Sequence, residues 1–251
     1  MMALKTLIVL TYVLMIAMNF LANALPLGGR TTGDISAKYP SLFTPAGFTF
    51  SIWGLIYVLI AIGVWHLVRT PTEDFNATHT LVAWVFVVSS LLNVLWLLTW
   101  HHDRIVLSTI VMIALFLTLA VGFIHTPHTW TPIRLGISVY FAWVSVALIA
   151  NVTIMLIAIR MPTLGVAESW WLVGILLIGL GIGLATVLTQ GDVAFGLVFL
   201  WAYAGILIRH TSSAELNLAY PQAIIITIVS LCLLTTASAI QFAINTWSLY
   251  R

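Results

Sequence analysis

The sequence predicts an all-α integral membrane protein, a polytopic bundle of about eight transmembrane helices. Hydrophobic residues make up 62% of the 251 residues and charged residues only 6%, whereas soluble domains are about 45–50% apolar and about 25% charged. The mean hydropathy is +1.13. The apolar residues form runs of about 18–25 residues, which is the length that crosses a hydrocarbon core about 30 Å thick. We therefore expect a multi-pass protein in a lipid bilayer, the cell membrane if the source is prokaryotic.

Clusters of Pro, Gly, Thr and charged residues separate the apolar runs and define the elements. The predicted spans are residues 4–25, 46–69, 80–100, 104–125, 133–160, 168–189, 191–209 and 221–246. The first span begins near Lys5 and ends at small residues, as a signal peptide does. Its apolar stretch of about 20 residues exceeds the usual apolar region of about 7–15 residues, so we interpret it as a retained helix.

Two features of the spans leave alternatives open. The turn Gln190-Gly191-Asp192 is short, and a seven-helix chain would fuse or lose a span there. With eight spans, basic residues are balanced between the two sides, so the positive-inside rule favours neither orientation. They are Lys5, Arg69, Arg134 and Arg251 on the terminal side against Arg30, Lys38, Arg104, Arg160 and Arg209 on the other.

One connection is long and polar, residues 26–44, and contains Arg30 and Lys38. Loops of this length without obvious secondary structure are usually lids over a site or disordered segments. We predict a lid.

Several function classes are excluded by what the sequence lacks. The only lysines, Lys5 and Lys38, lie outside the span centres, so a retinal Schiff base is excluded. Ion-coupled pumps usually need acidic residues in mid-membrane, and no predicted span has one there. Basic residues are scattered singly, which argues against nucleic acid as a partner. His101-His102-Asp103 points to different helix faces, so no metal site is predicted.

The eleven tryptophans are the most unusual feature. Five lie near span ends or in a loop, where membrane interfaces favour tryptophan: Trp65, Trp130, Trp170, Trp171 and Trp247. Others share a helix face with a second aromatic ring or an amide, because residues three or four apart are neighbours. These are Trp53 with Tyr57, and Asn93 with Trp96 and Trp100, while Trp143 precedes Asn151 by two turns. Both helix packing and a ligand site explain such faces.

The spacing of these motifs resembles the TspO and translocator protein family, also called tryptophan-rich sensory proteins. The stretch Pro40-Ser41, Pro45 and Ile52-Trp53-Gly54-Leu-Ile-Tyr57 resembles the entry to that family's second helix. Leu92-Asn93-Val-Leu-Trp96 is similar to its LNxxW signature, and Tyr140-Phe-Ala-Trp143 with Asn151 to its fifth-helix pattern. The resemblance covers residues 1–160 and implies a five-helix core there, followed by a three-helix extension over residues 161–251.

The resemblance also implies where a ligand would lie. Pro40 and Pro45 would end the lid loop 26–44 and direct the chain into a helix whose aromatic side chains line a pocket below the lid. The expected ligand-binding residues are Trp53, Tyr57, Asn93, Trp96, Trp143 and Asn151. Arg30 and Lys38 of the lid are the residues expected to meet a ligand carboxylate. The first loop departs from the family pattern, because it lacks the tryptophans that often precede the Lys-Pro of members.

The functional prediction is a membrane receptor or carrier for a planar apolar ligand, a tetrapyrrole of the porphyrin or haem type by resemblance. No further cofactor is expected to be required. The alternatives are a small-molecule permease and a porphyrin-degrading membrane enzyme, although no base or nucleophile in the sequence argues for an enzyme and no catalytic residue is predicted. The resemblance and the small-residue run from Gly179 to Gly183 suggest a homodimer.

Overall fold

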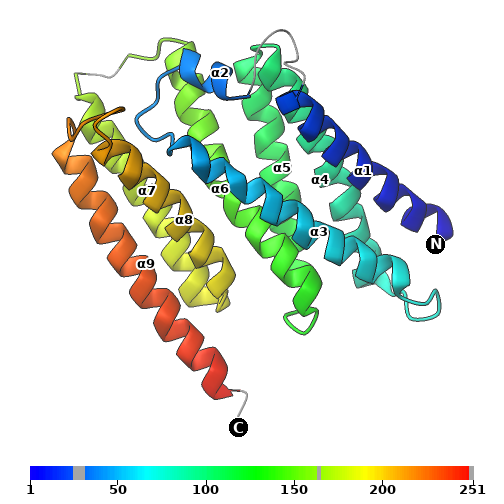
Figure 1. Cartoon of the computed structure of the whole chain (residues 1–251). Coiled ribbons are helices and arrows are strands. Elements are labelled where there is room, and N and C mark those ends of the chain that lie inside the picture. The colour runs from blue at the N-terminus through cyan, green and yellow to red at the C-terminus, as the bar shows by residue number, and fades with distance from the viewer. Residues whose placement is uncertain (25–31, 163–164, 249–251) are drawn as a thin grey trace. The chain divides into compact units, whose positions relative to one another are not determined.

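The computed structural model describes residues 1–24, 32–162 and 165–248, and all its regular structure is helical (Figure 1). Eight helices in this part of the chain are long and apolar enough to cross a membrane, which confirms the predicted fold class. They are α1 (Met2–Ala24), α3 (Ile52–Arg69), α4 (Ala77–His101), α5 (Ile105–His125), α6 (Thr131–Ala158), α7 (Glu168–Gln190), α8 (Val193–Thr211) and α9 (Pro221–Ser248).

The lid loop contains regular structure that the sequence did not predict. A short helix, α2 (Thr32–Lys38), lies within it, and a 3-10 helix, η2 (Gly47–Ser51), follows the loop and runs directly into α3.

By its contacts the chain forms two compact units, one of residues 1–39 and 52–158 and the other of residues 40–51 and 159–251. Residues 40–51, which we call the entry segment, therefore group with the C-terminal helices.

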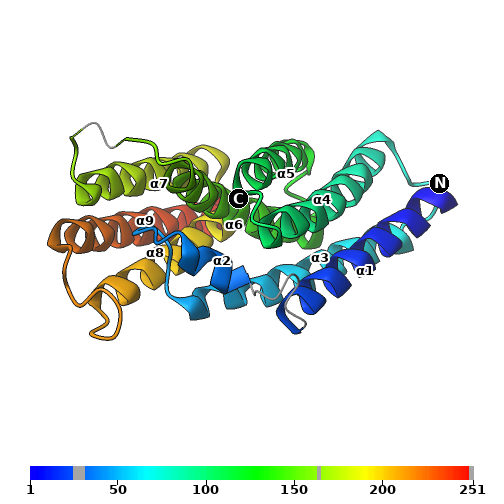
Figure 2. The same cartoon turned by 90° about the horizontal axis from the view of Figure 1, so that it is seen from above.

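In the first unit, five helices form a closed ring. Neighbours around the ring are α1 and α4, α4 and α5, α5 and α6, α6 and α3, and α3 and α1 (Figure 2). Close approach of α3 and α6 requires Gly136, because a Cβ there would lie 3.0 Å from the carbonyl oxygen of Leu59. The ring brings α3, α4 and α6, which carry the predicted aromatic residues, into one bundle.

Two basic side chains bind the carboxyl ends of helices in this unit. The Lys5 amine donates to the carbonyl oxygens of Val68, at 3.1 Å, and Thr70 at the end of α3. The Arg134 guanidinium donates to Phe123 and Thr126 carbonyl oxygens at the end of α5. Each cation thus satisfies carbonyl groups that have no partner within their own helix and opposes the helix dipole.

In the second unit, α7, α8 and α9 contact one another in all three pairs. The turn between α7 and α8 is sharply defined. Gly191 ends α7 in the left-handed conformation, with φ at +66°, and the Asp192 carboxylate caps α8 by accepting a hydrogen bond from the Phe195 amide. This stop and start signal separates two spans, so the eight-helix interpretation is correct and the seven-helix alternative is not.

The small-residue run of α7 packs inside the same unit. Gly179 and Gly183 are buried, and a Cβ on Gly183 would lie 2.9 Å from the Leu234 side chain of α9 and 3.3 Å from the Phe199 ring of α8. Gly183 therefore serves contacts within the chain, whereas Gly181 of the same run is exposed and a Cβ there would meet no heavy atom within 4 Å. The homodimer stays a prediction.

Candidate ligand site

Trp53, in the first turn of α3, lies at the centre of a group of aromatic rings. Its ring stacks on Tyr57 at a centroid distance of 5.7 Å and on Trp96 at 6.5 Å. It meets Tyr140 at 5.9 Å and Trp143 at 6.4 Å in edge geometry. We call Trp53, Tyr57, Trp96, Tyr140 and Trp143 the aromatic cluster. It joins α3, α4 and α6, as the resemblance implied for three of its tryptophans.

The sequence spacing explains why each helix presents two rings. Trp53 and Tyr57 are four residues apart and lie on one face of α3, while Tyr140 and Trp143 are three apart on α6. On α4, Trp96 also stacks on Trp100 at 5.9 Å. All these distances lie within the range of about 4.5–7 Å in which aromatic pairs attract each other.

Burial differs across the cluster. Trp96, Tyr140 and Trp143 are buried, with exposed fractions of 7%, 1% and 2%, whereas Trp53 and Tyr57 are half-buried. The Trp96 indole nitrogen is buried without a hydrogen-bond partner among the described residues. The cluster thus has a fixed inner part on α4 and α6 and a more accessible outer part on α3.

A buried polar layer adjoins the cluster. The Asn93 amide donates to the Tyr140 hydroxyl oxygen at 3.1 Å, and its side-chain oxygen accepts a hydrogen bond from the Asn19 amide at 2.7 Å. Asn93 has no exposed surface. Asn19 of α1 is 8% exposed. The sequence analysis missed it, although an asparagine inside an apolar span was the available signal.

Asn151 makes its described contacts elsewhere. Its side-chain oxygen accepts hydrogen bonds from Ser108 and Thr109 of α5, each at 3.2 Å. Asn151 follows Trp143 by eight residues on α6, which corresponds to about 12 Å along a helix axis. These contacts join α6 to α5. The place of Asn151 in the ligand site stays a prediction.

The predicted lid residues fall into three different settings. Arg30 lies outside the described residues. Lys38 ends α2 and forms an ion pair with Asp103, in the turn between α4 and α5, and the Tyr39 hydroxyl donates to the same carboxylate at 2.9 Å. The hydrogen bond to Asp103 raises the pKa of Lys38 above its ordinary value. Pro40 and Pro45 belong to the entry segment in the second unit.

The residues beside Asp103 are engaged with their own helix. The Nδ1 atoms of His101 and His102 lie 2.9 and 2.8 Å from the carbonyl oxygens of Leu97 and Leu98. Within the described ranges no group of three or more His, Cys, Asp and Glu residues is placed to hold a metal ion. Asp103, the third of these residues, contacts α2: its carboxylate binds Lys38 at the end of that helix.

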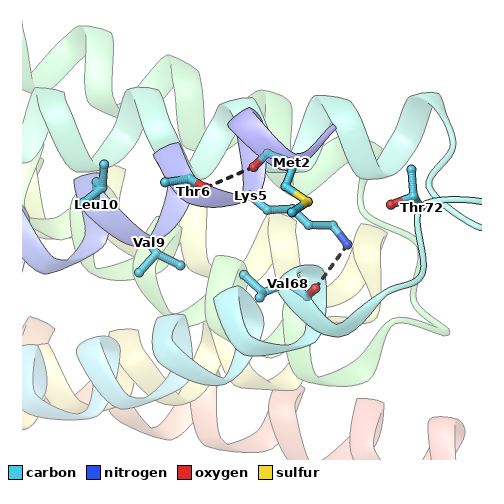
Figure 3. A pocket seen from close by; sticks show the side chains of 7 residues that line it. All are labelled: Met2, Lys5, Thr6, Val9, Leu10, Val68 and Thr72. Atoms are coloured by element: carbon cyan, nitrogen blue, oxygen red, sulfur yellow. Dashed lines mark hydrogen bonds between the residues drawn. The ribbon is translucent and has the colours of Figure 1, made fainter.

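A separate open groove of about 460 Å³ lies between α1 and the end of α3. It is lined by Lys5, Val9 and Leu10 of α1 and by Val68 of α3, and the Lys5 amine points to the Val68 carbonyl (Figure 3). Val68 follows Trp53 by fifteen residues, about 22 Å along the helix. The groove contains none of the predicted site residues.

A family model described as TSPO-like protein matches residues 5–240. This chain belongs to the TSPO-like protein family. Comparisons with curated proteins and with solved structures gave no match. The family match continues past residue 160, so it also includes α7, α8 and much of α9 of this TSPO-like protein. Membership and the eight apolar helices make it a multi-pass membrane protein of the ligand-binding or transport type.

Proposed function

We propose that this TSPO-like protein is a membrane receptor or carrier for a planar, largely apolar ligand, a tetrapyrrole, and that the aromatic cluster binds it. The observation that supports this most is the position of Trp53. Its half-buried ring stacks on the Trp96 ring and meets the Trp143 ring edge-on. The Trp96 and Trp143 side chains are buried. A flat conjugated ligand that entered between Trp53 and these two rings would contact the same aromatic surfaces.

Polar groups near the cluster fit a ligand that carries hydrogen-bond acceptors. The buried indole N–H of Trp96 lacks a partner among the described residues, and such a group costs free energy in apolar surroundings. An unprotonated, imine-type ring nitrogen or a carboxylate oxygen of the ligand would accept its hydrogen bond. A ligand carboxylate that reached Lys38 would compete with Asp103, which already binds that amine.

The direct test is a titration of the purified protein with protoporphyrin IX, followed by Soret absorbance and by tryptophan fluorescence. Trp143→Phe keeps an apolar ring but removes part of the aromatic surface that the ligand would contact, so we expect affinity to fall by about fivefold, equivalent to about 1 kcal/mol. Trp247→Phe is the matched control, because Trp247 is 68% exposed near the end of α9. It should bind like the parent.

One result would contradict the proposal. If Trp53→Phe, Trp96→Phe and Trp143→Phe all bind protoporphyrin IX like the parent and only lose thermal stability, the rings serve packing.

A second experiment distinguishes a carrier from a receptor, by measuring uptake of protoporphyrin IX into proteoliposomes. Protein-dependent, saturable uptake supports a carrier, whereas saturable binding without uptake supports a receptor.

A further inference from the structure

Helix α8 presents one face to the entry segment. Trp201, Gly205 and Arg209 follow each other at intervals of four residues, so they lie along one side of the helix. The Trp201 indole donates to the Thr49 carbonyl oxygen at 2.8 Å, and the Gly205 carbonyl oxygen accepts from the Ala46 amide at 3.1 Å. The entry segment therefore runs along α8 in the opposite direction.

The last turn of α8 binds the start of the entry segment. The Arg209 guanidinium donates to the carbonyl oxygens of Ser41 and Thr44, both at 2.7 Å. His210 Nε2 lies 3.0 Å from the Leu42 carbonyl oxygen. We call Trp201, Gly205, Arg209 and His210 the docking face of α8.

Steric fit adds to these hydrogen bonds. A Cβ on Gly205 would overlap the Thr49 hydroxyl, so only glycine lets the segment approach this closely. The Phe48 ring meets the Trp201 ring edge-on at a centroid distance of 5.5 Å. The docking face thus fixes both ends of a segment whose first residues have no helical hydrogen bonds of their own, and the contacts to Arg209 are of the stronger, charge-assisted kind.

The entry segment continues directly into the candidate ligand site. Its 3-10 helix ends at Ser51, α3 begins at Ile52, and Trp53 is the next residue. The first turn of α3 therefore follows the fixed segment without an intervening linker. We propose that the docking face of α8 positions this first turn and so controls access of the ligand to the aromatic cluster. The part on access rests on the proposed function.

The positioning part can be tested without ligand, by hydrogen–deuterium exchange of the full-length protein. Arg209→Gln and Trp201→Phe each remove hydrogen bonds to the entry segment. We expect about tenfold faster exchange over residues 41–51, and also over residues 52–57 of α3. Glu215→Gln is the matched control for Arg209, since it breaks only the ion pair at 3.1 Å. Arg160→Gln, at an exposed arginine of the same unit, is the second control. Both should exchange like the parent.

Two outcomes would overturn the proposal. The first is faster exchange that is limited to residues 41–51 in both Arg209→Gln and Trp201→Phe, because α8 would then fix the segment without positioning α3.

The second outcome concerns the binding of protoporphyrin IX. If the parent binds it and Trp143→Phe weakens binding, the two docking-face variants should change its association rate severalfold. Unchanged rates would refute control of access while leaving the proposed function intact. If the parent binds no porphyrin, the proposed function fails and the exchange result still decides the positioning role.

Discussion

Asn93 and Tyr140 are joined by a hydrogen bond of 3.1 Å from the amide to the hydroxyl oxygen, and both side chains are almost completely buried. The same Asn93 side chain accepts from Asn19 at 2.7 Å. One amide thus connects α1, α4 and α6 beneath the aromatic cluster. In the membrane interior such contacts are the specific part of helix association, because apolar side chains gain little by leaving lipid.

Asn93→Leu is expected to lower the free energy of unfolding by about 1–2 kcal/mol, since it leaves the Asn19 amide without this acceptor and the Tyr140 hydroxyl without this donor. Thermal unfolding in detergent measures the loss. Tyr140→Phe removes only one of the two contacts and should cost less. The double variant should cost less than the sum of the two single changes. Strict additivity would show that the two residues act independently.

Asn151→Leu should have a smaller effect on stability and none on binding of protoporphyrin IX. Ser108 and Thr109 both donate to Asn151, yet each also has a carbonyl oxygen of its own helix within hydrogen-bond distance, that of Ile105. They therefore keep a partner after the change. A loss of porphyrin affinity as large as that of Trp143→Phe would show that Asn151 contributes to ligand binding.

Asp103→Asn should release the end of α2. Asp103 has a φ of +59°, and asparagine tolerates this left-handed conformation, so the turn is kept while the charge is removed. We expect trypsin to cleave after Lys38 several times faster than in the parent. Asp74→Asn, at a carboxylate in the turn before α4, is the control. Equal rates in Asp103→Asn and the parent would show that the ion pair does not hold α2.

The same contact has a defined pH dependence. The pKa of Lys38 is raised in the folded protein, so its contribution to stability is fully present below the ordinary lysine value of 10.5 and is lost as pH rises through the raised value. Cleavage by a protease that is active at high pH should therefore accelerate near α2 above pH 10.5. Asp103→Asn should not show this acceleration.

Gly183→Val and Gly181→Val form a matched pair on α7. A Cβ at Gly183 meets Leu234 and Phe199, whereas one at Gly181 has no heavy atom within 4 Å. Overpacking at Gly183 is expected to cost about 1–3 kcal/mol, seen as a lower thermal midpoint. Gly181→Val should be close to neutral. If instead Gly181→Val alone changed the size of the particle in detergent, the exposed side of α7 would be the dimer surface.

The helices could be predicted from sequence because each depends on residues close to it in the chain. A span is defined locally by three features: the length of its apolar run, a capping residue at its start such as Asp192, and a residue that ends the helix such as Gly191. The rings of the aromatic cluster were also accessible, since spacings of three and four residues place them on helix faces. The contacts of Asn19, Asp103 and Arg209 could not be predicted, because their partners are far away in sequence: side chains for Asn19 and Asp103, and backbone carbonyl groups for Arg209. The four-residue spacing of Trp201, Gly205 and Arg209 was present, but nothing local indicates that an irregular segment lies on it.

The distance in sequence between α8 and the entry segment has a consequence for biosynthesis. Trp201 binds a carbonyl group 152 residues earlier in the chain, and Arg209 binds one 168 residues earlier. At a translation rate of about 5–20 residues per second, α8 emerges about 10–30 s after the segment it holds. At the end of that interval, once Trp143 has been added, the nascent chain contains every ring of the aromatic cluster, while the entry segment still lacks its partners on α8. The last steps of translation and insertion would thus fix the segment that precedes α3 only after the rings of the aromatic cluster were made.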